Sequence, residues 1–125
     1  MRLGFHRAYF LRRQKIHCRG TVPENLEIFL DHFPDFPVLP GVLALDILRE
    51  SVDLCNSEGQ FKESTEPPLQ SLHAVKFQHF LRPGEAWESH ANYLPGAAAG
   101  SWNVKLVVQN RTAVSARMVF SSMVN

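Results

Sequence analysis

The chain has 125 residues, a mass of 14.2 kDa and a formal net charge of +1. Its length suits one domain over residues 1–125, because domains cluster near ~100–150 residues, and its 45% hydrophobic content argues against disorder. No apolar run approaches the ~18 residues of a membrane span, and the near-neutral charge gives no strong attraction to nucleic acid. We therefore expect a folded domain with neither a membrane span nor a nucleic-acid partner.

The first 20 residues are basic: they hold six of the 13 Lys and Arg residues and no acid. Such a run is typical of a solvated arm, with a basic patch for an acidic partner as the alternative. It contains no apolar stretch of the secretory type. Cys18 and Cys55 show no Cys-x-x-Cys spacing, so two free thiols and a reducing, cytoplasmic location are expected.

The first half of the chain predicts one strand, a stiff bend and one long helix. In the expected strand 14–22, Ile16, Cys18 and Val22 share one face. Residues 24–30 favour a helical turn, and residues 32–41 carry three prolines, which exclude a regular helix or central strand. A helix is expected over 41–56, with an apolar stripe of Leu45, Leu48, Val52 and Cys55.

The second half predicts strands. A polar loop over 56–68 precedes expected strands at 70–81, 86–94, 101–109 and 112–121, of which the last two form a hairpin. The connections between these strands are short, which favours antiparallel pairing. A single helix packed on a curled antiparallel sheet buries both elements economically, so the fold class is α+β.

Spacing alone does not identify a catalytic site. The six histidines show no metal-ligand spacing, so no metal site is expected. His32 stands directly before the rigid bend, and Gly41 opens the helix, where amide N–H groups and the dipole's positive end favour anionic oxygen. A lone histidine is nevertheless more often structural. Asp46 falls on a helix face with Arg49 and Glu50, which is typical of a solvated face, although its apolar neighbours favour a desolvated, protonated carboxyl as the alternative.

Residues 31–46, DHFPDFPVLPGVLALD, resemble the active-site segment of the β-hydroxyacyl-acyl-carrier-protein dehydratases, a hot-dog-fold family. Seven positions match in type and spacing: His32, Phe33, Pro34, Pro37, Pro40, Gly41 and Asp46. Residues 75–84, VKFQHFLRPG, are similar to the family's strand and Pro-Gly turn. The resemblance implies a hot-dog fold, with one central helix wrapped by a curled antiparallel sheet of about five to six strands.

The resemblance also implies a hydro-lyase that needs no cofactor. His32 is then the catalytic base at C2 of a 3-hydroxyacyl thioester, and Asp46 polarises the leaving 3-hydroxyl. The Gly41 amide binds the thioester carbonyl, with Phe33, Pro40 and Val42 beside the substrate. The helix stripe with Phe33, Phe36, Phe77 and Phe80 is expected to line an acyl tunnel, with plain core packing as the alternative for at least half of these rings.

The family pairs the histidine of one subunit with the acid of another. We therefore expect a homodimer, or a higher multiple of dimers, that acts on carrier-protein or CoA thioesters in fatty-acid or related lipid or polyene synthesis. The basic N-terminal run is the candidate contact for an acidic carrier protein.

Two departures from the family pattern leave alternatives open. Asp31 and Asp35 stand where the family usually has glycine, and their charge favours a protonated His32, which is a poorer base. A non-catalytic acyl-binding subunit is therefore one alternative. An acyl thioesterase is the other, although the sequence shows no thioesterase motif.

Overall fold

The computed structural model describes residues 5–12, 15–31, 33, 35–56, 69–95 and 100–120, with backbone alone for residues 5–12 and 53–56. Residues 57–68 of the loop expected over 56–68, much of the loop 95–100, and the site residues His32 and Pro34 lie outside the described residues. The described elements, in chain order, are β1 (Phe5–Arg12), β2 (Lys15–Thr21), α1 (Ile28–Asp31), α2 (Gly41–Asn56), β3 (Leu69–Phe77), β4 (Ala86–Tyr93), β5 (Ser101–Val108) and β6 (Arg111–Phe120).

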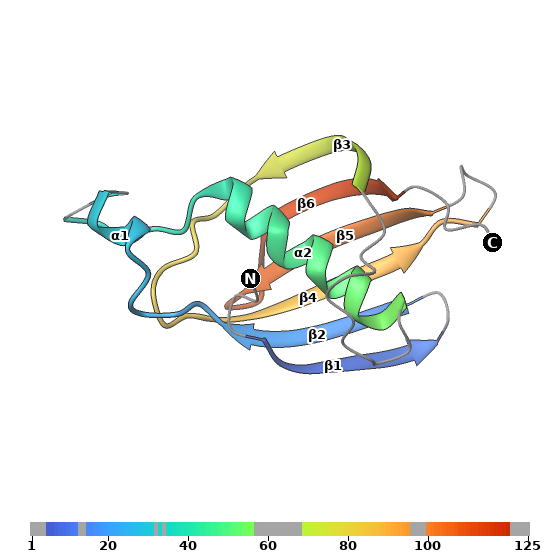
Figure 1. Ribbon diagram of the computed structural model, residues 1–125, viewed down its shortest axis with the longest axis horizontal. Helices are drawn as coiled ribbons and strands as arrows, with labels where there is room; N and C mark the ends of the chain where they lie inside the picture. The colour runs from blue at the N-terminus through green and yellow to red at the C-terminus, as the bar shows by residue number, and fades with distance from the viewer. Residues whose placement is uncertain are drawn as a thin grey trace.

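The six strands form one antiparallel sheet in the order β1-β2-β4-β5-β6-β3. Helix α2 lies across one face of this sheet, and α1 lies at the end where α2 begins (Figure 1). The predicted hairpin of the last two strands is confirmed, and its tight turn uses positive φ at Gln109 and Asn110, as hairpin turns of the primed types require. The two strands at the edges of the sheet are β1 and β3.

The core lies between α2 and the facing side of the sheet. Ile47, Leu48 and Val52 of the helix are almost fully buried, and burying each such side chain contributes about 1.5–3 kcal/mol. A buried hydroxyl pair joins the two layers, because Ser89 Oγ of β4 donates to Ser51 Oγ of α2 at 2.8 Å. The predicted helix 41–56 is thus confirmed, and its stripe faces the sheet as expected; the side chain of Cys55 lies outside the described residues.

The strands alternate between this core and the opposite face of the sheet, here called the outer face. Ile16, Cys18 and Val22 are buried, whereas Lys15 and Arg19 are exposed. The same period of two holds on β5, where the buried side chains are Trp102, Val104, Leu106 and Val108. These patterns confirm the predicted faces, because successive side chains of a strand point to opposite sides.

The basic N-terminal run is not a solvated arm. Residues 5–12 of this run form β1, which pairs antiparallel with β2 from Phe5↔Gly20 to Arg12↔Lys15, and residues 15–20 belong to β2 itself. The prediction of a single strand at 14–22 was therefore incomplete. Alternation of apolar and polar residues is weak in this segment, and an edge strand bonded to one neighbour needs little of it.

Two further boundaries differ from the predictions. Strand β3 ends at Phe77 and not at residue 81. The amides of Gln78 and His79 both donate hydrogen bonds to the Ala113 carbonyl of β6, which breaks the regular pairing of the strand. The helical turn expected at 24–30 lies later, at α1. No described helix is long and apolar enough to cross a membrane.

Candidate functional site

The proline-rich bend is fixed to the body of the protein before α2 begins. Val38 and Leu39 are buried, and the Leu39 amide donates to the Leu81 carbonyl at 2.7 Å. The Pro40 carbonyl then accepts hydrogen bonds from the amides of Leu43 and Ala44, which starts the helix. The first amides of a helix have no hydrogen-bond partner within the helix. Because the bend is fixed, these N–H groups of the first turn of α2 are held in a defined place.

Gly41 allows a close approach between this helix start and β3. A Cβ atom at position 41 would lie 2.6 Å from Cε1 of Phe77, which is shorter than any van der Waals contact. Only glycine therefore lets the Phe77 ring lie directly against the first turn of α2.

An open cavity of about 330 Å³ lies at this contact. Its lining is apolar apart from one imidazole, and consists of Leu39, Gly41, Val42, Ala44, Phe77, His79, Phe80, Leu81 and Val114. Two of the predicted substrate-binding residues, Gly41 and Val42, thus lie together in one cavity. Pro40 lies beside it, at the helix start.

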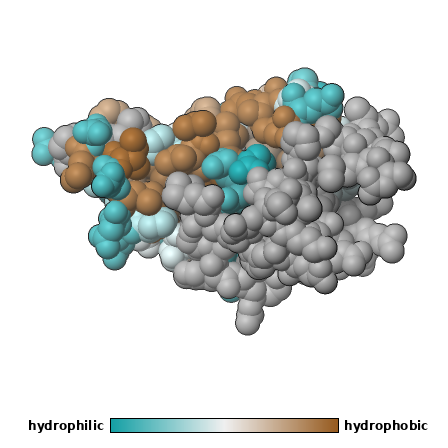
Figure 2. All heavy atoms as spheres, viewed as in Figure 1, coloured by the Kyte–Doolittle hydropathy of each residue, from teal (hydrophilic) through white to brown (hydrophobic). Residues whose placement is uncertain are grey.

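The cavity opens onto an apolar surface. Figure 2 shows brown spheres that extend from α1 across the start of α2 to β3. Its members are exposed large apolar side chains: Ile28, Leu30, Phe33, Phe36, Val42, Leu72, Val75, Phe77 and Phe80. A continuous apolar surface of this kind is typical of a binding or subunit interface.

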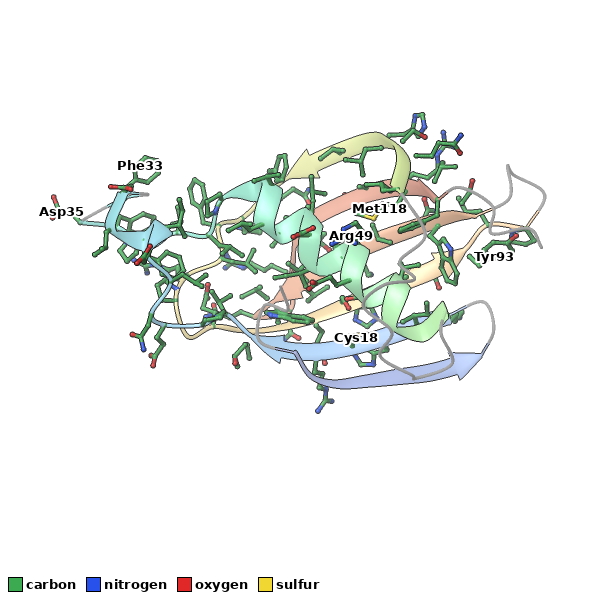
Figure 3. The ribbon with its side chains drawn as sticks, in the orientation of Figure 1. Cys18, Phe33, Asp35, Arg49, Tyr93 and Met118 are labelled. Carbon is green, nitrogen blue, oxygen red and sulfur yellow. The ribbon has the colours of Figure 1, made fainter. Side chains whose placement is uncertain are left out.

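The four phenylalanines expected in the acyl tunnel are all exposed, so the expectation that half of them are core was wrong. Phe77 and Phe80 line the cavity. Phe36 packs edge-to-face on Phe80 at 6.3 Å between ring centroids, under the guanidinium of Arg82. Phe33 lies at the end of the molecule formed by α1 and the bend, together with Asp35 (Figure 3).

Asp46 lies on α2, one turn beyond the cavity lining. Its carboxylate accepts a hydrogen bond from Arg49 Nε at 3.1 Å, and both side chains are partly exposed. This pair fits a solvated helix face, but Glu50, predicted on the same face, is 4% exposed. Burial raises the pKa of Glu50, and the nearby charge of Asp46 adds to this effect.

His79 is a cavity residue that the sequence did not indicate. It was one of six histidines without a recognisable spacing, and it reaches the cavity because the chain turns back after β3. The described part of the cavity therefore contains one imidazole. The second expected imidazole, His32, lies outside the described residues.

Comparisons with known proteins agree with the sequence resemblance. The model of a family described as ApeI-like, the ApeI dehydratases, matches residues 10–117. The 3-hydroxyacyl-[acyl-carrier-protein] dehydratase FabZ of Lactobacillus helveticus is 27% identical over 108 residues, which are 86% of this chain and 73% of that protein. The enzyme of the same name from Chlamydia abortus is 26% identical over 119 residues, covering 91% and 76%.

Similar solved structures confirm the hot-dog fold. The dehydratase heterocomplex ApeI:P from Xenorhabdus doucetiae superposes with a TM-score of 0.73 at 20% identity, covering 98% of this chain and all of that one. The thioesterase HI1161 from Haemophilus influenzae gives 0.60 at 13% identity, covering 90% and 74%. Since dehydratases and thioesterases share this fold, the fold does not choose between the two activities.

Proposed function

The chain belongs to the ApeI-like dehydratase family, and on this premise we propose that it removes water from 3-hydroxyacyl thioesters to give 2-enoyl thioesters. The observation that carries the proposal is the apolar cavity at the start of α2. There the Phe77 ring lies directly against Gly41, which belongs to the segment 31–46 that resembles the dehydratases. We place this reaction in fatty-acid or related lipid or polyene synthesis.

The elimination needs help at three atoms of the substrate. Neutral His32 takes the C2 proton, and such general-base help is typically worth ~10²–10⁴-fold. The Gly41 amide stabilises the enolate-like thioester oxygen, where losing one donor typically costs about 3–4 kcal/mol. Asp46 assists departure of the C3 hydroxyl as water. The proton from C2 and the C3 hydroxyl leave together as one water, and a C2–C3 double bond remains.

The cavity is suited to the acyl chain of such a substrate. Val42, Phe77 and Phe80 supply apolar surface beside the first turn of α2. An acyl chain in contact with them gains roughly 0.8 kcal/mol for each buried CH₂ group. In the proposed complex, the thioester lies at the helix start and the chain extends along the cavity, with Pro40 and Phe33 at its border.

We further propose that the complete site needs a second copy of the chain. Within one chain Asp46 pairs with Arg49 and does not line the cavity. Strand β3 is a sheet edge whose Leu72, Val75 and Phe77 are exposed, which suits pairing with the same edge of a partner. In the resulting dimer, each active site combines His32 of one chain with Asp46 of the other.

The thioester is proposed to be carried by an acyl carrier protein, as in the names of the FabZ relatives, with a CoA thioester as the second possibility. We propose the basic N-terminal run as the contact for an acidic carrier; of its cations, Lys15 and Arg19 are described and exposed, and the side chains of the others lie outside the described residues. We place the reaction in the cytoplasm, without a metal or cofactor at the active site.

The test is hydration of an enoyl thioester by three variants with single imidazole or carboxyl changes. His32→Ala and Asp46→Asn are expected to lose at least ~10²-fold in kcat/KM. His79→Ala is the matched control, because it removes the imidazole that does line the described cavity and is expected to retain most activity. Full activity of His32→Ala, or a collapse confined to His79→Ala, contradicts the assignment.

A second candidate function is a non-catalytic acyl-binding subunit. It is favoured by Asp31 and Asp35, which are exposed and close in sequence to the expected base, and by the heterocomplex in which the similar ApeI structure occurs. Acyl-thioester binding without turnover would favour it over the dehydratase. Release of free thiol, measured with a thiol-reactive dye, would instead indicate a thioesterase.

A further inference from the structure

Three potential metal ligands meet on the outer face of the sheet, on the side opposite α2. His17 of β2 and His90 of β4 are direct cross-strand partners, and their rings stack at 4.5 Å between centroids, 13° from parallel. Glu88 lies two residues before His90 and therefore on the same face of β4. No local sequence spacing signals this group, because the pairing of β2 with β4 creates it.

The ligand atoms of these residues lie close together. Glu88 Oε2 lies 3.6 Å from His17 Nε2, and Glu88 Oε1 lies 3.9 Å from His90 Nε2. One ligand atom from each of the three residues lies within 4.8 Å of the other two. Ligand atoms around a tetrahedral ion bonded at about 2.0–2.1 Å lie somewhat closer than this, so small side-chain rotations would complete the arrangement.

We propose that His17, Glu88 and His90 bind one first-row transition metal ion of the Zn²⁺ class. Two imidazoles with one carboxylate are a common zinc donor set, and a fourth position remains for water. The strands that carry them are flanked on both sides in the sheet, so the ligands are held on a rigid base.

Neighbouring charges restrict the kind of ion. Arg19 Nε lies 3.5 Å from Glu88 Oε2, and Lys105 is the cross-strand partner of His90 on β5. These cations oppose hard ions such as Mg²⁺ and Ca²⁺, which depend on several oxygen ligands. An ion that prefers imidazole, such as Zn²⁺, Ni²⁺ or Cu²⁺, is less dependent on the carboxylate.

The test is calorimetric titration of the untagged protein with Zn²⁺, with Mg²⁺ as the comparison ion. We expect one Zn²⁺ per chain and no Mg²⁺ binding. His17→Gln and His90→Gln should each weaken Zn²⁺ binding by at least ~10–100-fold. That is the typical loss when a residue that only hydrogen-bonds to a metal ligand is replaced, and these variants remove a ligand itself. Arg19→Gln should strengthen it, because the cation that competes for Glu88 is removed.

The matched control is His73→Gln, on β3, whose imidazole is bonded to Ser71 Oγ instead. It should bind Zn²⁺ like the unchanged protein. A Co²⁺ spectrum should lack the thiolate charge-transfer band, which excludes binding through cysteine. Absence of Zn²⁺ binding, unchanged binding in folded His90→Gln, or a thiolate band would each overturn the proposal.

Discussion

Gly41 lies so close to the Phe77 ring that any side chain at this position has to displace the ring. In Gly41→Ala the new methyl group would start 2.6 Å from Cε1 of Phe77. Phe77 is 56% exposed, so the ring can swing away at little cost in stability. It would then move within the cavity that it lines. We expect kcat/KM for enoyl-thioester hydration to fall by about 10²-fold while the melting temperature changes little.

A second substitution tests whether the effect comes from the steric contact with Phe77, because alanine keeps the backbone amide at position 41. Phe77→Leu shortens the side chain that the new methyl group meets, so the double variant Gly41→Ala/Phe77→Leu should regain part of the lost activity. Equal activity of Gly41→Ala and the unchanged protein would show that the contact with Phe77 does not shape the site. A double-mutant cycle on kcat/KM measures the coupling.

Glu50 makes stability depend on pH in a defined direction. Burial raises the pKa of this carboxyl, so between the ordinary value near ~4.3 and the raised value the folded state binds more protons than the unfolded state. The stability that comes from the protonated Glu50 carboxyl is therefore fully present below the ordinary pKa. It is lost as the pH rises through the raised pKa of the folded state. Each unit of pKa difference corresponds to about 1.4 kcal/mol.

The expected result is a pH-dependent effect of Glu50→Gln. We compare the free energy of unfolding of the variant with that of the unchanged protein at each pH. The difference, variant minus unchanged, should be larger at pH 7 than at pH 4, because glutamine has no charge to bury. Urea denaturation of both proteins across this range measures the difference. A difference that is constant with pH would contradict the assignment of the titration to Glu50.

The candidate site could be predicted in part from its residues. Glycine at the helix start and the proline bend were readable, because both residue types restrict the backbone in known ways. The burial of Glu50 was not readable, since helical periodicity gives the direction of a side chain but not what packs over it. The cluster of His17 with His90 was likewise hidden, because its cause is a register between two distant strands.

Among the elements, β3 is where association of two chains should be tested. It is an edge strand with neighbours on one side only, and its Val75 is exposed. Val75→Glu places a charge on this apolar edge in both chains of a symmetric β3 pairing, and burying or crowding such charges at the seam is destabilising. We expect the variant to be monomeric at concentrations where the unchanged protein is dimeric, as measured by analytical ultracentrifugation.

A control with the same added charge is Asn103→Glu. Asn103 is exposed on β5, which has a neighbouring strand on each side, so this variant should stay dimeric. If Val75→Glu is also dimeric, another surface holds the two chains together. If the unchanged protein is monomeric, the proposed pairing of β3 edges is wrong.

Helices and strands could be predicted from the sequence where one face of the element is buried and the other is exposed. Helix α2 and strands β5 and β6 show strong periods in sequence, because one face of each packs on the core. Strand β1 was missed because an edge strand needs little apolar alternation. The irregularity in β3 was also hidden: Ala74 has a φ of 52°, beside a register shift between His73 and Lys76, and alanine gives no signal for the left-handed region.

At the scale of the whole molecule, the proposed site has a consequence that no single chain shows. If His32 and Asp46 of one site come from different chains, each dimer holds two sites of mixed origin. A heterodimer of His32→Ala with Asp46→Asn then has one site with both changes and one site with neither. Two inactive proteins should therefore restore each other's activity when their subunits exchange.

The expected recovery follows from the arithmetic of random exchange. An equal mixture yields heterodimers for about half of all dimers, each with one intact site of two, so activity should rise to about a quarter of that of the unchanged protein. Partial unfolding and refolding of the mixture allows exchange, and enoyl-thioester hydration is the measurement. Each variant refolded alone is the control and should stay inactive. If refolded mixtures stay inactive while mass spectrometry detects heterodimers, His32 and Asp46 act within one chain.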